Sequence, residues 1–219
     1  MALFTPRANQ LGLIVVPLEG SRARTRGTRA SFTLPSGRPR GAESLDDAAR
    51  RIASDSAPVA PAFVEQAVTL AAAAGGAARS ASVTVVYFAL APEILESTHG
   101  GVPWLSLSQL DALSARDRLE VDVALNAMRA RMDHRPVAFH LLPPSFTLAE
   151  LQMIYELLLG RRLHKASFRR SLSASGLVEA LEEWRSDGRG RPAQLFRYSP
   201  LRGRHRLRGG GVRFDLLSD

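Results

Sequence analysis

The clearest hydrophobic pattern in the chain is the run SVTVVYFAL at residues 82–90, where almost every side chain is β-branched, aromatic or aliphatic. A continuous apolar run of this length predicts a strand that is buried on both faces of a sheet. The rest of the first 140 residues predicts two more strands, over 11–18 and 30–37. It also predicts helices near 44–54 and over 61–74, and one or two helices over 105–132. This mixture predicts an α/β or α+β domain over residues 1–140.

The pattern changes after residues 138–146, which are predicted to form a hinge because the Pro-Pro pair at 143–144 cannot continue a helix. A helix with an apolar stripe is predicted next. Thr147 and Glu150 have the spacing of a capping box at its start, and Gly160 stops it.

A second short helix is predicted over 164–176, followed by two strand-like runs, LVEALEEWR and AQLFRYSP, around a Gly- and Arg-rich tip. Helix, short connection, helix and β-hairpin, in that order, is the plan of a winged helix-turn-helix. The chain is therefore predicted to hold two domains, over 1–140 and 141–219, the second with a basic, low-complexity C-terminal tail.

The second helix has the pattern of a DNA recognition helix. Phe168 and Leu172 lie four positions apart and are predicted to face the core. The residues predicted to face DNA are polar or basic: Lys165, Ser167, Arg169, Arg170 and Ser173. Guanidinium groups suit phosphates and guanine edges. The alternative is a solvated basic surface on an ordinary helix, and the neighbouring capped helix and hairpin favour the DNA reading.

The hairpin tip GRGRPAQ is predicted to act as the wing. Arg189 and Arg191 stand on a Gly-flexible turn and could enter a narrow minor groove, where negative potential is concentrated. Gln194 is a further candidate for contact with a base or a phosphate, or it stands at the rim. The alternative is a tight hairpin turn that happens to be arginine-rich. Trp184 and Phe196 are predicted to form the hydrophobic floor of the hairpin.

Charge supports a polyanionic partner. The net charge is +8, and residues 146–219 carry 14 basic and 8 acidic side chains. A basic C-terminal third favours nucleic-acid binding. However, Lys165 is the single lysine among 29 basic residues and alanine is abundant, which also fits a GC-rich genome that enriches arginine throughout.

Other classes of protein are disfavoured. The chain has no cysteine, which excludes disulfides and thiolate metal sites. No apolar run approaches the ~18 residues of a membrane span, and the first residues lack the features of a signal peptide. The five histidines show no metal-ligand spacing. We therefore expect a cytoplasmic protein without a membrane partner.

The sequence FTLAELQMIYELLLGRRLHKASFRRSLSASGLVE, continued by GRGRPAQLFRYSP, resembles the C-terminal winged helix of the Nudix-related transcriptional regulators of the NrtR type. The resemblance covers residues 146–200. It implies an N-terminal Nudix-like α/β/α sandwich that senses a nucleotide, and a homodimer that binds a palindromic operator in double-stranded DNA. Typical members of that family repress genes of NAD biosynthesis or of sugar utilisation.

A degenerate Nudix box is identified over residues 37–59. Gly37, Glu43 and Arg51 stand at the family's spacing. The positions of the three metal-binding glutamates and of the second glycine carry other residues: Ile52, Asp55, Ser56 and Pro58. In a functional box, carboxylates on one helical face hold Mg²⁺ against a diphosphate. With those carboxylates missing, we expect no metal, no catalytic residue and no hydrolase activity.

Loss of the metal need not abolish nucleotide binding. The residues predicted to bind an effector such as ADP-ribose, NAD or ATP lie in the box: Arg38, Arg40, Glu43 and Arg51. Arginine forks could replace the metal at the phosphates. The alternatives are that the arginines are solvated or contact the DNA backbone, and that Glu43 and Arg51 form a structural ion pair.

The sequence therefore predicts a dimeric repressor of NAD biosynthesis or cofactor-metabolism genes that responds to a nucleotide. Three other functions stay open: a Nudix hydrolase of nucleoside diphosphates such as ADP-ribose, a repressor of a sugar-utilisation operon, and a module that binds RNA or unspecific DNA through charge alone.

Overall fold

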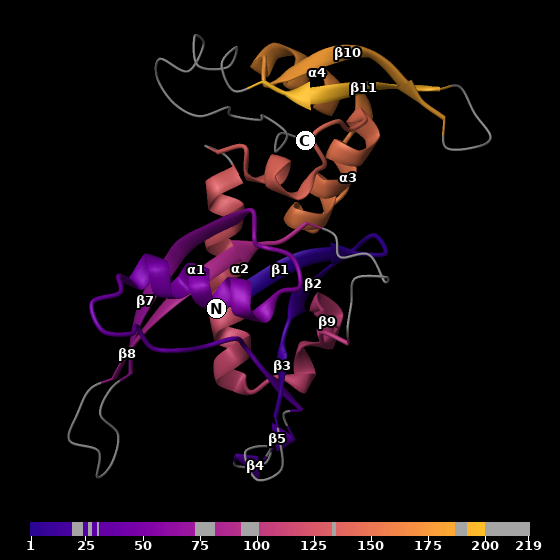
Figure 1. The fold of residues 1–219 in the computed structure, drawn as a ribbon. Helices are drawn as coiled ribbons and strands as arrows, with labels where there is room; N and C mark the ends of the chain where they lie inside the picture. Colours follow the sequence, from indigo (N-terminus) through magenta and orange to yellow (C-terminus); the bar gives the residue numbers. More distant parts are fainter. Residues whose placement is uncertain are drawn as a thin grey trace. The chain divides into compact units, whose positions relative to one another are not determined.

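The computed structural model describes residues 1–18, 24–25, 28–29, 31–72, 82–92, 101–132, 135–186 and 192–199. They belong to two compact units, Met1–Met128 and Arg129–Asp219, each described by itself below. Figure 1 shows strands and helices mixed in the first unit, and helices followed by a hairpin in the second. No helix in the described part of the chain is long and apolar enough to cross a membrane.

The first unit is built on a five-stranded mixed sheet with the strand order β7-β8-β1-β2-β9. Its strands are β1 (Ala2–Arg7), β2 (Gln10–Ile14), β7 (Phe63–Ala72), β8 (Ser82–Leu90) and β9 (Trp104–Ser106). β1 runs parallel to β8, and the other neighbouring strands are antiparallel. The strand predicted at 82–90 is confirmed as β8, and it is fully buried from Val86 to Leu90.

The helix predicted over 61–74 is wrong, because residues 63–72 form strand β7. Its alanine run and the following Gly-Gly favoured a helix with a stop signal. However, β7 pairs with β8 along its length, and the rings of Phe63 and Phe88 lie 5.7 Å apart between centroids. This non-local pairing overrides the local preference of alanine for helix.

Two other predicted strands are shorter than expected. The run 11–18 is divided between β2 and β3 (Val16–Pro17), and the run 30–37 is extended but pairs only at β6 (Phe32–Thr33). Two further short strands, β4 (Arg24–Thr25) and β5 (Thr28–Arg29), pair with each other between them. The extended segment that follows β6 leads into the box.

Two helices pack on the sheet, and Figure 1 shows α1 in front of it and α2 behind it. Helix α1 (Leu45–Ser56) confirms the helix predicted at 44–54, and Ser44 caps it by accepting a hydrogen bond from the Asp47 amide. Ala49 and Ala53 of α1 lie in one buried cluster with Leu3 and Tyr87 of the sheet. The segment 105–132 forms η3 (Leu107–Ala112) and α2 (Ala115–Met132).

The second unit follows the plan expected from sequence. Its elements are η4 (Val137–Leu141), α3 (Leu148–Leu159), α4 (Lys165–Ser175), β10 (Val178–Arg185) and β11 (Ala193–Tyr198). The capping box is confirmed, because Thr147 accepts from the Glu150 amide while Glu150 accepts from the Thr147 amide. Gly160 ends α3 in the left-handed conformation at φ +72°.

The segment predicted as a hinge packs into this unit. The ring of Phe139 contacts Phe146 at 5.8 Å and Tyr198 at 4.6 Å between centroids. Phe146 also exchanges two backbone hydrogen bonds with Phe196 of β11, at 2.9 and 2.8 Å. These contacts join the residues before α3 to the hairpin.

Candidate functional site

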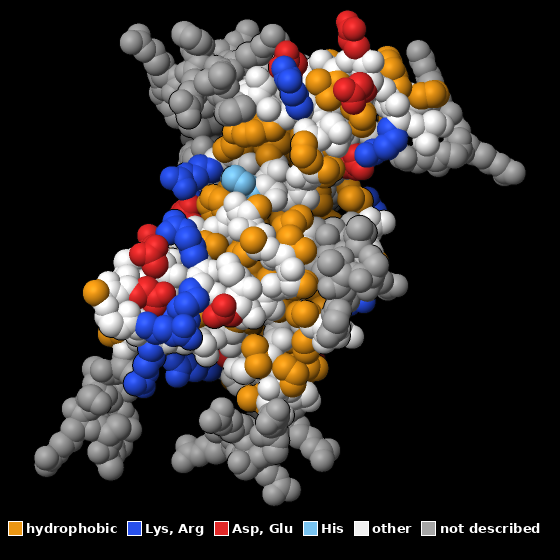
Figure 2. All heavy atoms as spheres, viewed as in Figure 1, with side chains coloured by type: hydrophobic (Ala, Val, Ile, Leu, Met, Phe, Trp, Pro, Cys, Tyr) orange, Lys and Arg blue, Asp and Glu red, His pale blue; other side chains and the backbone are white. Residues whose placement is uncertain are grey.

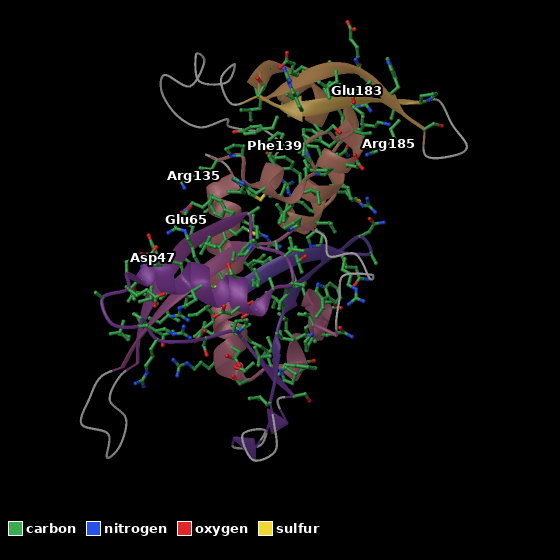
Figure 3. The ribbon with its side chains drawn as sticks, viewed as in Figure 1. Asp47, Glu65, Arg135, Phe139, Glu183 and Arg185 are labelled. Carbon is green, nitrogen blue, oxygen red and sulfur yellow. The ribbon has the colours of Figure 1, made fainter. Side chains whose placement is uncertain are left out.

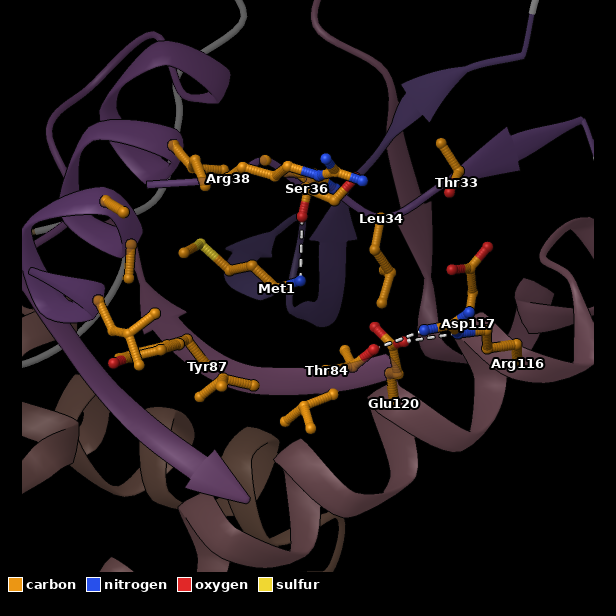
Figure 4. Close-up of a pocket in the computed structure, with 18 of the residues that line it drawn as sticks. Met1, Thr33, Leu34, Ser36, Arg38, Thr84, Tyr87, Arg116, Asp117 and Glu120 are labelled. Carbon is orange, nitrogen blue, oxygen red and sulfur yellow. Dashed lines mark hydrogen bonds and ion pairs between the residues drawn. The ribbon is translucent and has the colours of Figure 1, made fainter. Parts of the chain in front are cut away.

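A cleft of about 880 Å³ opens in the first unit between α1, β8, the segment 33–39 and the start of α2. Figure 4 shows Arg38 extended along one side of it and a group of charged residues at the other end. Its apolar lining includes Leu45, Ala48, Ala49 and Ile52 from α1. The small alanines leave space where longer side chains would fill the cleft.

The α1 positions that hold a metal in a functional box carry one apolar and two polar side chains, and each is engaged elsewhere or exposed. Ile52 lines the cleft and packs so closely against Gly37 that a Cβ on Gly37 would lie 2.9 Å from Ile52 Cδ1. The Ser56 hydroxyl donates to the Ile52 carbonyl at 2.7 Å, and the Asp55 side chain is 64% exposed, 4.0 Å from Arg51. No group of three or more potential metal-ligating side chains occurs among the residues whose positions are described.

Glu43 and Arg51 form a structural ion pair, which was the alternative to a role in binding the effector. Arg51 donates to both Glu43 oxygens at 2.9 and 2.8 Å, and to the Arg38 carbonyl at 3.2 Å. Glu43 also accepts the Arg40 amide at 2.9 Å. Chiefly through the Arg51 hydrogen bond, the pKa of Glu43 is lowered to about 2. Both side chains are thereby committed to holding the loop 38–43 against α1.

The two other predicted effector residues differ in position. Arg38 lines the cleft, whereas Arg40 stands outside the lining and contributes its backbone amide to Glu43. Over α1, Figure 2 shows acidic and basic side chains interleaved on the surface, and Arg50 pairs there with Asp47 at 3.5 Å. Of the four predicted residues, Arg38 is therefore the one whose side chain can reach a ligand in the cleft.

The far end of the cleft holds residues that sequence reasoning missed. Arg116 pairs with the buried Glu120 at 3.3 Å and donates to the Thr84 hydroxyl, and Asp117 lies beside them. One local signal in the sequence could have located the start of α2: Ser114 caps this helix by accepting the Asp117 amide at 3.1 Å. However, the sequence does not reveal that the fold brings the start of α2 to the same cleft as α1.

Tyr87 forms another polar point of the lining. Its hydroxyl donates to Asp46 of α1 at 2.6 Å. Burial and this bond to a carboxylate raise the pKa of Tyr87 to about 12, so the phenol stays protonated. The hydroxyl therefore ties α1 to β8 at the cleft.

In the second unit, α4 has the two faces expected of a recognition helix. Phe168 and Leu172 are buried, and the Phe168 ring meets that of Tyr155 on α3 edge-on at 5.6 Å between centroids. The residues predicted to read DNA are all exposed: Lys165, Ser167, Arg169, Arg170 and Ser173. Among the described residues, one of them has a side-chain hydrogen bond: Ser167 Oγ lies 3.3 Å from His164 Nδ1.

The turn before α4 is fixed by side chains of α3. Glu156 accepts the Leu163 amide at 3.0 Å, and Gln152 donates to the Leu163 carbonyl at 3.1 Å and to Glu156 at 2.9 Å. Hydrogen bonds from Leu163, Gln152 and Arg162 outweigh partial burial and hold the pKa of Glu156 below its usual value. Both polar groups of the Leu163 backbone are therefore satisfied, two residues before α4 begins.

The hairpin β10–β11 is confirmed, but two of its residues differ from expectation. Gln194 donates to the Leu181 carbonyl across the hairpin at 3.1 Å, where the register shifts between Ala180 and Trp184. Trp184 is not part of a hydrophobic floor, because it is 57% exposed; Leu195 is the buried residue of β11. Along β10, Ala180, Glu182 and Trp184 are all exposed, so the solvent-facing alternation continues through the register shift. Arg189 and Arg191 lie outside the described residues.

Comparisons with known proteins agree with this division. Residues 138–198 match the family model of the NrtR DNA-binding winged helix domain. A curated relative from Acinetobacter baylyi, named an ADPR responsive transcriptional repressor NtrR, is 40% identical over 131 residues, which are 55% of this chain and 50% of the relative. The chain thus spans about half the length of the curated relative it matches.

The solved structures show the fold. NrtR of Shewanella oneidensis in complex with a 27mer DNA matches with a TM-score of 0.74 and 27% identity, covering 97% of this chain and 95% of that one. A MutT/nudix family protein from Enterococcus faecalis, 21% identical, matches in fold with a TM-score of 0.66 over 91% of this chain and 86% of that one. The predicted fold class, a Nudix-like domain with a winged helix-turn-helix, is confirmed, as is the resemblance to NrtR.

Proposed function

We propose that this chain is a DNA-binding transcriptional repressor controlled by an ADP-ribose-like nucleotide, because residues 138–198 match the NrtR winged-helix family model and the fold matches that of NrtR. The observation that carries the proposal is the α4 surface. Arg169 and Arg170 are exposed on the helix whose opposite face, at Phe168 and Leu172, is anchored on α3. A recognition helix requires this combination of a rigid seat and projecting basic side chains.

In this proposal, Lys165, Ser167 and Ser173 contribute contacts beside the two arginines, and Arg189, Arg191 and Gln194 act from the wing. Gln194 already bonds Leu181, which favours a role in shaping the hairpin. Two half-sites of a palindromic operator would be read by a homodimer, since paired modules multiply a modest affinity.

The DNA-binding test is an electrophoretic mobility shift with the double variant R169A/R170A. A matched control, R50A/R118A, removes two positive charges from exposed ion pairs of the other unit. We expect the first variant to lose the operator complex and the second to keep it. Equal affinity of R169A/R170A and wild type would show that α4 is not the reading helix.

The effector is proposed to bind in the cleft of the first unit. The named relative is ADPR responsive, and the cleft combines an apolar floor with Arg38 at its side. No described cluster of carboxylates offers a metal site, so the proposal involves no cofactor and no hydrolysis. Calorimetric titration with ADP-ribose, NAD and ATP, each with Mg²⁺ and with EDTA, tests it. Heats from ADP-ribose that persist in EDTA are expected, and the absence of binding by all three would refute the effector role.

The regulated genes are proposed to be those of NAD biosynthesis, with a sugar-utilisation operon as the alternative within the same family. Sequencing of DNA captured by the protein would distinguish them. A Nudix hydrolase would instead release product from ADP-ribose in Mg²⁺. A binder of RNA or unspecific DNA would lose its complex to excess random DNA at moderate salt, whereas an operator-specific protein would not.

A further inference from the structure

Glu150 connects two elements of the winged helix that are far apart in sequence. One carboxylate oxygen accepts the Thr147 amide at 2.7 Å and the Thr147 hydroxyl at 3.1 Å, which completes the capping box of α3. The other oxygen pairs with the guanidinium of Arg185. Burial alone would raise the pKa of Glu150, but the bonds from Thr147 and Arg185 prevail and keep it below its usual value. The carboxylate is therefore ionised and fully engaged.

Arg185 is the last residue of β10, and its side chain, labelled in Figure 3, lies beside α3. The chain leads from there directly into the tip that carries Arg189 and Arg191. Between Ala180 and Trp184 the hairpin has a register shift, so the distal part of β10 is not aligned by a continuous ladder with its proximal part. An anchor is thus placed where the strand has lost its regular alignment and just before the tip.

We propose that Glu150 is a positioning residue for the β10–β11 hairpin of the wing: through Arg185 it fixes the distal end of β10 to α3, and so holds the hairpin in place beside the α3–α4 pair that reads DNA. This inference rests on the proposed DNA-binding function. Neither Glu150 nor Arg185 needs to touch DNA for it to hold. The α3 scaffold then fixes both reading elements, since Gln152 and Glu156 hold the turn before α4.

The proposal can be tested by whether the substitution E150Q strengthens or weakens operator binding. Replacing a glutamate with glutamine near a polyanion removes repulsion, so simple electrostatics predicts tighter DNA binding. If Glu150 positions the wing, E150Q weakens binding instead. The substitution is also gentle, because glutamine serves in a capping box as well as glutamate does. The helix start is retained while the ion pair loses its charge.

The matched control is E179Q. Glu179 pairs with Arg197 across the same hairpin at 3.0 Å, but both residues belong to the hairpin, so this pair does not connect it to α3. E179Q removes the same charge without loosening the anchor. We expect operator affinity to fall about twofold to fivefold in E150Q, the range that a half-exposed ion pair supports, and to stay equal or rise in E179Q.

The salt dependence of binding distinguishes a positioning role of Arg185 from a direct contact with DNA. If Arg185 binds a phosphate, R185Q reduces the slope of log affinity against log salt by about one. If it acts through position, R185Q weakens binding at an unchanged slope, R185K restores most of it, and E150Q/R185Q is no weaker than either single variant. Thermal unfolding of each variant provides the check on folding, and R185Q leaves the capping box untouched if E150Q should be unstable.

The outcomes separate the two proposals. A wild-type chain that binds no operator specifically refutes the DNA-binding function itself. A wild type that binds, with E150Q equal to or tighter than wild type, overturns the positioning role alone. A reduced salt slope in R185Q also overturns it and makes Arg185 a phosphate contact.

Discussion

Replacement of Phe168 by alanine should undock the recognition helix without touching its DNA-facing surface. Phe168 is fully buried, its ring meets Tyr155, and it supplies α4 with one of its two buried side chains, the other being Leu172. Truncation of a buried Phe costs about 3–5 kcal/mol, part of which is the lost aromatic pair at about 0.5–1.5 kcal/mol. A small unit has only about 5–15 kcal/mol of stability in total, so the loss is a large fraction.

The chain offers a convenient assay for this variant. It has two tryptophans, Trp184 in the hairpin and Trp104 in the first unit. In a W104F background, urea or thermal unfolding followed by fluorescence therefore reports on the second unit. The midpoint of thermal unfolding should fall by roughly 12 °C or more, at about 4–8 °C for each kcal/mol in a unit of this size.

The adjacent residue supplies the control. Arg169 is exposed on the same helix, and a surface substitution of this kind changes stability by about 0.5 kcal/mol or less. R169A should therefore weaken operator binding with unchanged unfolding, whereas F168A should lower the free energy of unfolding first. If the free energy of unfolding of F168A falls by less than about 1 kcal/mol, Phe168 does not hold α4 on α3, because truncation of a fully buried Phe destabilises a protein by more than this.

Three further predictions concern the loops and the box. G160A should destabilise the second unit by about 1–2 kcal/mol in urea unfolding, because position 160 has a φ of +72° that alanine resists. The folded-state pKa of Glu43 is about 2 against an ordinary 4.5, so the stability it contributes is present above pH 4.5 and is lost as the pH falls toward 2; wild type should lose more stability than E43Q between pH 6 and pH 3. I52E should not yield Mg²⁺-dependent cleavage of the diphosphate of ADP-ribose in a product-release assay, because Asp55 is exposed beside Arg51 and Ser56 bonds the Ile52 carbonyl.

Elements with a local signal could be predicted from the sequence. The apolar run of β8, the Thr147 cap and the Gly160 stop each depend on residues within a few positions, and all are found in the structure. Strand β7 could not be predicted in this way, since its nature depends on pairing with β8. The exposure of Trp184 follows from its place on the solvent-facing side of β10 with Ala180 and Glu182, which the apolar character of tryptophan did not indicate.

The candidate cleft divides in the same manner. The box spacing identified Gly37, Glu43 and Arg51, and the ion pair between the last two was one of the alternatives weighed. By contrast, Glu120 and Arg116 come from a helix more than 60 residues later, and only the fold brings them to the cleft. Residues that are brought together only by the tertiary fold form no motif of fixed spacing in the sequence.

The residues retained in the box and those replaced have different physical tasks in this structure. Glu43 and Arg51 join the loop 38–43 to α1, and the Ile52 side chain packs against Gly37. Ile52 and Ser56 stand where metal ligands would be, and each is now satisfied by packing or by a backbone hydrogen bond. The residues that shape the cleft are thus retained, whereas the glutamates that would bind the metal are replaced. In the proposed function, such a cleft binds and releases a nucleotide unchanged, as a sensor must.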